Sequence, residues 1–430
     1  MSQAATRNHF SSILERTSPP VISRLMAAAL ANPDLISLAA GFVDQGSLPV
    51  EATRQVMAEV FANPAEGRRA LQYGTTIGDP GLRRELLRLL ERNEAKSPGS
   101  FEHLLPRTIV TTGSQQLLYL VGEVLLEPGD IVLVESPTYF VFLGVLESRG
   151  ARAVGVEIDS GGMRLDSLES TFAEIEERGE LGRVKLVYSI TEHSNPTGLS
   201  LANDRRKGLV DTMKRWSKLR TIFLLEDAAY RGLNYSENDP PSVWGHDLEG
   251  DTVILARTFS KTFSPGIKTG FGIVPESLVN PILDLKGNHD FGSANLNQQV
   301  LARVLSEGLY ERQIQTLLPM YRRKRDAMLR ALETHFEGVD GVSWTRPKGG
   351  LFVWFSAPEG VDLGPNGPVV ARCLEKGVLY VPGNFAIPAE PGPVATNQAR
   401  LCFGVPSEAD LDEGVRRLAE ALAECLDPVA

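Results

Sequence analysis

Apolar residues in the middle of the chain gather in short, mostly unbroken runs, and most runs are separated by helix-like stretches. Unbroken runs of apolar residues are typical of strands that are buried on both faces, as in a parallel sheet covered by helices. The pattern therefore predicts an α/β fold with a mostly parallel, seven-stranded sheet. The seven runs are Ile109–Val110, Ile131–Val134, Ala153–Val156, Val184–Tyr188, Ile222–Leu225, Val253–Ala256 and Phe271–Val274.

Both ends of the chain have a different pattern. Helical periodicity covers residues 50–61 and 79–92, and it returns from about residue 295. Short apolar runs near 342–345, 351–355, 378–381 and 400–403, followed by a helical stretch over 410–425, predict a smaller α+β unit. The basic stretch Arg322–Arg325 is expected to be a solvated helix face. We predict a large domain over residues 71–300 and a small domain made from residues 1–70 and 301–430.

Ligands of open α/β sheets bind beyond the carboxyl ends of the strands, so the polar residues that follow each run are site candidates. Ser114 begins a helix, where free amides attract an anion, although an ordinary serine N-cap explains it equally well. Tyr139 follows the second run and offers a ring for stacking on a planar ligand. Asn195 precedes a proline, and Asp227 and Tyr230 follow a buried run and would share a face if the chain turned helical there.

The stretch from Thr258 to Gly272 combines small hydroxylated residues and turn glycines with two lysines, Lys261 and Lys268. Hydroxyls and glycines suit a phosphate cradle, and a sheltered lysine can attack a carbonyl as a free amine. A cradle beside a nucleophilic amine indicates pyridoxal 5′-phosphate (PLP) as the cofactor. The alternative is a surface loop with two solvated lysines.

Composition narrows the partners and the compartment. The chain has 430 residues and a net charge of −10, which argues against a nucleic-acid or anionic-membrane partner. Its three cysteines form no CxxC pair and no metal-binding spacing, so a reducing compartment and no metal site are expected. The N-terminus has no apolar signal region, and no apolar run is long enough to cross a bilayer. A cytoplasmic location is therefore expected.

Taken in order, these features resemble the class I/II aminotransferases of the fold type I PLP-dependent enzymes. The resemblance extends from about Leu35 to Glu420, and its most specific parts are Asn195–Gly198, Asp227 with Tyr230, Ser260-Lys261, Pro265–Gly270 and Arg400. It implies transfer of an amino group between an L-amino acid and a 2-oxo acid by a ping-pong mechanism. It also implies a homodimer with shared active sites, and it points to the subgroup that is similar to aminoadipate and kynurenine aminotransferases.

The resemblance assigns a role to each site residue. Lys261 is expected to form the internal Schiff base and to move the α-proton, and Asp227 to hold the proton on the pyridine nitrogen. Asn195 and Tyr230 match the partners of the ring's phenolic oxygen, and Tyr139 matches the stacking position. Gly41, Asn195 and Arg400 match the contacts with the substrate carboxylate. The expected phosphate contacts are Ser114, Gln115, Thr258, Ser260 and Lys268, with Tyr73 supplied by the neighbouring subunit.

Three departures from the family pattern stand out. Lys268 replaces the usual arginine, which removes the fork geometry and puts cofactor affinity in doubt. Glu192–Ser194 and Val43-Asp44 also differ and are expected near the substrate side, where they would bear on specificity. Acidic, apolar and aromatic substrates all stay open. By analogy, the helical stretch Ile22–Ala31 with Arg24 is expected to gate the site.

Two other functions stay open at this point. The first is another PLP reaction on the same frame, by a lyase, racemase or decarboxylase. The second is a transcription regulator with an aminotransferase-like ligand domain. Such regulators add a winged helix ahead of this frame, and the stretch before Gly41 is expected to be too short for one.

Overall fold

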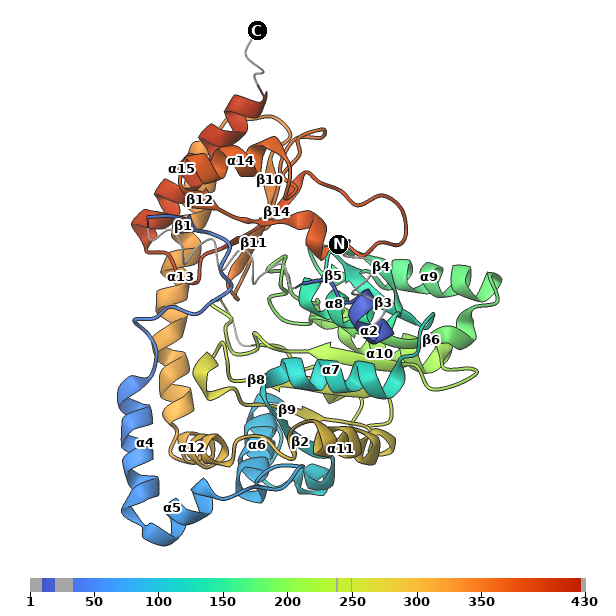
Figure 1. The fold of residues 1–430 in the computed structure, drawn as a ribbon, viewed down its shortest axis with the longest axis vertical. Helices are drawn as coiled ribbons and strands as arrows, with labels where there is room; N and C mark the ends of the chain where they lie inside the picture. Colours follow the sequence, from blue (N-terminus) through green and yellow to red (C-terminus); the bar gives the residue numbers. More distant parts are fainter. Residues whose placement is uncertain (1–9, 20–33, 237–238, 249, 427–430) are drawn as a thin grey trace.

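The computed structural model describes residues 10–19, 34–236, 239–248 and 250–426. The predicted gate helix Ile22–Ala31, with Arg24, lies outside these residues. Figure 1 shows two parts: a large α/β layer structure, and a smaller unit, coloured orange to red, that contains the C-terminal third of the chain. Within the described residues, no helix is both long and apolar enough to cross a membrane.

The large sheet confirms the predicted α/β class. All seven predicted strands are present, and an eighth, β5, has only two residues, too few to leave a periodic signal. Every neighbouring pair is parallel except those made by β9 and β5. In sheet order the strands are β2 (Thr108–Thr111), β9 (Gly270–Ile273), β8 (Val253–Thr258), β7 (Phe223–Asp227), β6 (Val184–Ser189), β3 (Ile131–Ser136), β4 (Arg152–Asp159) and β5 (Gly162–Met163).

Helices cover both faces of this sheet because the side chains of each strand alternate between two cores. Ile131 and Leu133 of β3 pack into one core with α6, α9, α10 and α12, whereas Val132 and Val134 pack into the other with α7, α8 and α11. The covering helices are α6 (Pro80–Asn93), α7 (Gly113–Leu125), α8 (Phe140–Arg149), α9 (Leu165–Glu177), α10 (Asn203–Trp216), α11 (Glu276–Asp290) and α12 (Asn295–Ser306).

The smaller unit has its own sheet and core. Strands β10 (Ser343–Trp344), β11 (Phe352–Ser356), β14 (Gln398–Cys402) and β13 (Val381–Pro382) form an antiparallel sheet in that order, and β1 (Ile36–Ser37) pairs in parallel with β12 (Val378–Leu379). The helices are α13 (Leu309–His335), α14 (Pro368–Glu375) and α15 (Glu408–Leu426). The register places Arg400 of β14 opposite Trp354 of β11.

The N-terminal helices α4 (Val50–Ala62) and α5 (Pro64–Leu71) pack against α12 (Figure 1). Their residues Val56, Val60 and Ala70 belong to the core of the large sheet, whereas β1 pairs within the smaller unit. The predicted boundaries at residues 70 and 300 stay predictions. The remaining helices of the described residues are α2 (Ser12–Arg16), η1 (Glu102–Arg107), η2 (Leu181–Arg183), η3 (Trp244–His246), η4 (Pro265–Ile267) and η5 (Gly383–Ala386).

The expectation of a solvated basic face at Arg322–Arg325 is wrong for one of its residues. Lys324 is buried, and its Nζ lies 2.7 Å from Asp44 Oδ1 and 3.1 Å from the Gly404 carbonyl oxygen. The lysine points inward because the loop after Gly41 and the turn after β14 both face this side of α13. An ion pair with low solvent exposure therefore ties that loop to the helix.

Candidate active site

The candidate residues lie where strands of the large sheet end. Asp227 is the last residue of β7, and Asn195 lies in the loop that follows β6. Lys261 follows β8 after two residues, and Ser114 lies in the first turn of α7, directly after β2. The parallel arrangement brings these ends to one edge of the sheet, as the sequence predicts.

Asp227 is a buried carboxylate with one oxygen left for a ligand. The hydroxyl of Tyr188 donates to its Oδ2 at 2.8 Å, and Oδ1 has no hydrogen-bond partner within the described residues. Burial raises the pKa of Asp227 to about 6, and the hydrogen bond from Tyr188 partly offsets that rise. A buried acceptor without a donor is costly, so this site is built for a group that brings a proton.

The side-chain amine of Lys261 has a lower pKa than is usual for lysine. Its Nζ donates to the Gly41 carbonyl oxygen at 2.8 Å. Burial, together with the positive charges of Arg400 and Lys268, lowers the pKa of Lys261 to about 8. A larger fraction of this amine is therefore unprotonated at neutral pH than is usual for lysine, which suits a nucleophile or a base.

A cradle for an anion forms between α7 and the segment after β8. The Oγ1 of Thr258 and the Oγ of Ser260 lie 2.9 Å apart, and Gly113 has a φ of +72° at the start of α7. A Cβ on Gly270 would lie 2.7 Å from the Ser114 nitrogen, so only glycine allows this close approach. Gln115 adds a buried Oε1 that has no partner in the described part of the chain, and Lys268 is exposed at a φ of +49°.

Arg400 connects the two parts of the molecule. Its Nη1 donates to Asn195 Oδ1 at 2.9 Å, its Nη2 donates to the Ala39 carbonyl oxygen at 2.6 Å, and its Nε has no partner within the described residues. The guanidinium lies 4.5 Å from the ring centre of Phe352 and 5.4 Å from that of Phe140. A buried cation between two rings with a free donor suits a carboxylate ligand.

The phenol of Tyr139 is close enough to Asp227 and to Arg400 for both charges to act on it. Burial raises the pKa of Tyr139, the charge of Asp227 raises it further, and the charge of Arg400 lowers it. Tyr230 is buried, and its ring meets that of Phe352 edge-on, with 5.6 Å between centres. Residues 228–232 form a turn rather than a helix, so Asp227 and Tyr230 do not share a helix face.

These residues fit PLP. The cofactor has an aldehyde for an amine, a pyridine nitrogen for a carboxylate and a phosphate for a cradle, and the site offers Lys261, the free Oδ1 of Asp227 and the turn around Ser114. The family model "Aminotransferase class I and II" matches residues 33–418. The chain belongs to this family.

Relatives of this aminotransferase include named enzymes. The aromatic-amino-acid aminotransferase 1 of Thermococcus litoralis is 34% identical, covering 91% of this chain and 88% of that protein. The 2-aminoadipate transaminase of Thermus thermophilus is 32% identical, covering 91% and 90%. The crystal structure of Pyrococcus horikoshii kynurenine aminotransferase superposes with a TM-score of 0.88 at 32% identity, covering 98% of both chains. The chain is a PLP-dependent transaminase of fold type I, and nothing favours a lyase, racemase or decarboxylase.

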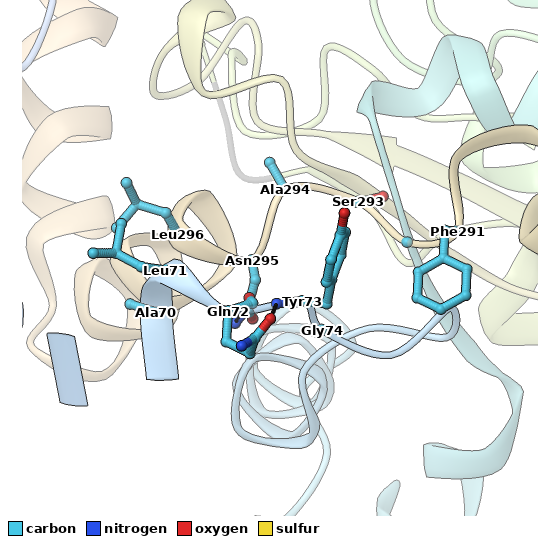
Figure 2. Close-up of a pocket in the computed structure, with 11 residues that line it drawn as sticks. Ala70, Leu71, Gln72, Tyr73, Gly74, Phe291, Ser293, Ala294, Asn295 and Leu296 are labelled. Carbon is cyan, nitrogen blue, oxygen red and sulfur yellow. Dashed lines mark hydrogen bonds between the residues drawn. The ribbon is translucent and has the colours of Figure 1, made fainter. Parts of the chain in front are cut away.

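Tyr73 of the aminotransferase, predicted to contact the cofactor of the partner subunit, lies on the surface. It is 81% exposed, and its ring meets Phe291 edge-on, with 5.6 Å between centres. Figure 2 shows both rings at a hollow of about 470 Å³, lined by residues 70–74 and 291–296. None of the other predicted site residues lines this hollow.

Two neighbours of the site escaped the sequence analysis. Tyr188 is the only aromatic residue in the run of β6, which was the available signal for its bond to Asp227. Phe352 contacts both Arg400 and Tyr230, and no local signal separates it from an ordinary core residue of β11. Both are recognised only once distant segments are brought together.

Two of the departures carry acidic side chains that are already paired inside the protein, and their expected place near the substrate stays a prediction. Glu192 is buried and bonded to Arg206 and Arg231. Asp44 is paired with Lys324. Both carboxylates are already neutralised by buried or half-buried cations, so neither offers a free charge to a substrate.

Proposed function

We propose that this transaminase acts on amino acids with large side chains, aromatic or long acidic ones, with a 2-oxo acid as acceptor. The observation that carries the proposal is the burial of Arg400 between Phe140 and Phe352, which places a carboxylate-binding group beside apolar ring faces. The relatives named for aromatic amino acids, 2-aminoadipate and kynurenine support it.

The proposed site keeps the predicted roles. Lys261 would hold the aldehyde of PLP, and Asp227 would accept a hydrogen bond from its protonated ring nitrogen. Asn195 and Tyr230 would contact the ring's phenolic oxygen, and Tyr139 would stack on the ring. Arg400 and the Gly41 loop would bind the substrate carboxylate. The phosphate would meet Ser114, Gln115, Thr258, Ser260 and Lys268.

Bound PLP supplies an electron-withdrawing ring that stabilises the negative charge left on the substrate's Cα when its proton leaves. Lys261 would take that proton as a base and later give it up as an acid, a role that suits an amine whose pKa is lowered to about 8. Asp227, when ionised, would stabilise a protonated ring nitrogen. Arg400 would orient the substrate by its carboxylate.

We also propose a homodimer in which Tyr73 reaches the cofactor phosphate of the partner subunit. The exposure of Tyr73, Phe291 and Leu71 beside one hollow supports a contact with another chain, because exposed apolar clusters mark interaction surfaces. Mixing inactive Lys261→Ala and Tyr73→Ala proteins tests it. A mixed dimer would hold one intact site and recover activity, and no recovery after verified subunit exchange would contradict the shared site.

A cytoplasmic location is part of the same proposal. The thiols of Cys373, Cys402 and Cys425 are free, as is usual for proteins of a reducing compartment.

A substrate screen with the PLP-loaded protein tests the function. Each candidate amino acid is added alone, and the change in cofactor absorbance and the 2-oxo acid released are measured. Aromatic amino acids, kynurenine and 2-aminoadipate are expected to react faster than alanine or aspartate. A faster reaction with alanine or aspartate would overturn the proposed substrate class while leaving the transaminase assignment intact.

A further inference from the structure

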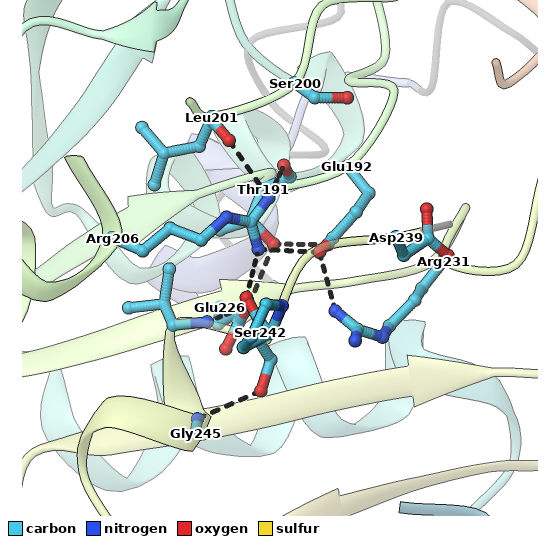
Figure 3. A network of polar contacts seen from close by, with 12 residues as sticks. Thr191, Glu192, Ser200, Leu201, Arg206, Glu226, Arg231, Asp239, Ser242 and Gly245 are labelled. Carbon is cyan, nitrogen blue, oxygen red and sulfur yellow. Dashed lines mark hydrogen bonds and ion pairs between the residues drawn. The ribbon is translucent and has the colours of Figure 1, made fainter. Parts of the chain in front are cut away.

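Five buried charged residues form one cluster on the far side of β7 from Asp227. We call Glu94, Glu192, Arg206, Glu226 and Arg231 the buried charge cluster, and each is less than 10% exposed. Glu226 and Asp227 are neighbours in a strand, so their side chains point to opposite faces of the sheet. Figure 3 shows Arg206 reaching Glu192 from one side and Arg231 from the other.

The buried charge cluster is joined by the chain to three of the proposed ring contacts. Glu226 directly precedes Asp227, and Arg231 directly follows Tyr230. Glu192 lies three residues before Asn195, in the same buried loop. Bonds within the cluster therefore fix the loop that carries Asn195 relative to the segment that carries Asp227 and Tyr230.

Glu192 is the anion at the centre of the cluster. Its Oε1 accepts from Arg206 Nη1 at 2.8 Å and from Arg231 Nη1 at 2.9 Å. Arg231 Nη2 also lies 3.4 Å from Glu94 Oε1, so two cations face two anions. Attraction to Arg206 and Arg231 outweighs burial and lowers the pKa of Glu192. Two guanidinium groups on one oxygen leave this carboxylate ionised.

Thr191 bridges the two central carboxyl groups. Its Oγ1 lies 2.5 Å from Glu192 Oε2 and 2.9 Å from Glu226 Oε1. A hydroxyl has one hydrogen to donate, and an ionised carboxylate has none. One of the two contacts therefore needs a proton on a carboxyl group. Glu192 is held by two cations, which leaves Glu226 as the carrier.

The surroundings of Glu226 act in both directions. The backbone nitrogens of Val243 and Trp244 donate to it at 3.0 Å and 2.7 Å and, with the charge of Arg206, favour the ionised form. Burial raises the pKa of Glu226 to about 7, and the charge of Glu192 adds to the rise. Other charged groups nearby are Asp239, which lies 3.8 Å from His193 Nε2, and Asp227 across the strand.

We infer that the carboxyl group of Glu226 is protonated in mildly acidic to neutral solution. It donates a hydrogen bond to the Thr191 hydroxyl, which in turn donates a hydrogen bond to Glu192. The buried charge cluster is then electrically neutral, with Arg206 and Arg231 balanced by Glu94 and Glu192. Glu192 and Glu226 act as positioning residues that hold the segments of Asn195, Asp227 and Tyr230. The protonation stands on its own contacts, whereas the positioning role rests on the proposed function.

An infrared difference spectrum tests the protonation directly. The PLP-loaded wild type is compared with Glu226→Gln at pH 6. We expect a carbonyl band of a protonated carboxylic acid in the wild type that the variant lacks and that fades as the pH rises. Glu135→Gln is the control, because Glu135 is another buried carboxyl, bonded to Ser189 Oγ at 2.6 Å, and its loss should remove a different band. The inference is overturned if the wild type and Glu226→Gln show the same carboxylic-acid bands.

A pair of glutamine variants tests the positioning role. In Glu226→Gln, the amide replaces a neutral acid, so the pH midpoint of the bound cofactor's absorbance should stay at the wild-type value. Glu192→Gln removes an anion between two arginines, and we expect the midpoint to shift by about one pH unit, the size usual for loss of a nearby charge. A shift in Glu226→Gln with none in Glu192→Gln overturns the role.

The two experiments fail in different ways. The infrared band reports the proton on Glu226 whether or not PLP binds where we propose. An infrared band that disappears as expected, together with unmoved midpoints in both variants, would keep the protonation and refute the positioning role. If Glu192→Gln does not fold, Glu192→Asp replaces it, and recovery of the wild-type midpoint with the shorter anion is the supporting result.

Discussion

Replacing Tyr188 with phenylalanine should raise the pKa of Asp227. Tyr188 donates its hydroxyl hydrogen to Asp227 Oδ2 at 2.8 Å, and both residues are buried. A hydrogen bond to a charged group contributes about 1.5–3 kcal/mol, and 1.36 kcal/mol corresponds to one pKa unit, so the shift is about one to two units. The sign follows because the lost bond favours the ionised carboxylate. From a pKa of about 6, the ionised fraction at pH 7 would fall from about nine tenths to about one half or less.

The measurement is PLP affinity as a function of pH. Cofactor-free wild type and Tyr188→Phe are titrated with PLP, and the absorbance of the bound cofactor is followed. Because ionised Asp227 is the proposed partner of the ring nitrogen, affinity should fall on the acid side, and the midpoint of that fall should move upward by about one pH unit or more in the variant.

Tyr380→Phe is the matched control for this experiment. Tyr380 is equally buried, but its hydroxyl donates to the Leu363 carbonyl oxygen at 3.1 Å, within the smaller unit. The control should lose a similar amount of stability and keep the wild-type midpoint. If Tyr188→Phe also keeps it, the hydrogen bond does not support the charge of Asp227 and the reasoning fails.

Four further predictions concern the proposed site. Lys261→Ala should lower kcat at least about 100-fold, as loss of a general base does, and kcat close to wild type would refute the role. Arg400→Lys should raise KM for amino acid and 2-oxo acid about 10-fold or more, since a point charge replaces a two-pronged donor; unchanged KM values would contradict carboxylate binding. Gly270→Ala should weaken PLP binding and lower Tm, because its Cβ would lie 2.6 Å from the Arg257 carbonyl oxygen, and normal PLP titration would show that the cradle tolerates a side chain. Asp44→Asn should lower Tm more than Asp326→Asn, because Asp44 pairs with buried Lys324 whereas Asp326 is more exposed, and equal melting would refute the anchoring of the Gly41 loop.

Strands of the large sheet were predictable because most are unbroken apolar runs with a core on both faces; the run of β6 contains one lysine, Lys185. Ile131–Val134, for example, sends alternate side chains into two cores and leaves no polar position to blur the signal. Helix α6 was predictable for a different reason, since Asp79 accepts a hydrogen bond from the Leu82 nitrogen and Pro80 occupies the first turn. Helix α5 escaped because Gly67 and its arginines leave only a short apolar face.

The site residues could be proposed from the sequence because each lies next to a strand end, but their contacts could not. Arg400 and Asn195 are 205 positions apart and meet only when the smaller sheet docks on the larger one. Lys324 was wrongly expected in solvent, since its partner Asp44 lies 280 positions away and local charge patterning cannot reveal it. Long-range pairing is the part of the molecule that one sequence does not disclose.

Helix α13 has a consequence for how the molecule melts. Leu309 and Tyr310, at its start, belong to the core of the large sheet, whereas Leu317 and Tyr321 belong to that of the smaller unit, and Pro319 lies between the last two. The same helix therefore packs into both hydrophobic cores. Because unfolding of either core removes the packing of half of this helix, the two cores should unfold together and give a single calorimetric peak. Any bending of the helix should occur at the proline.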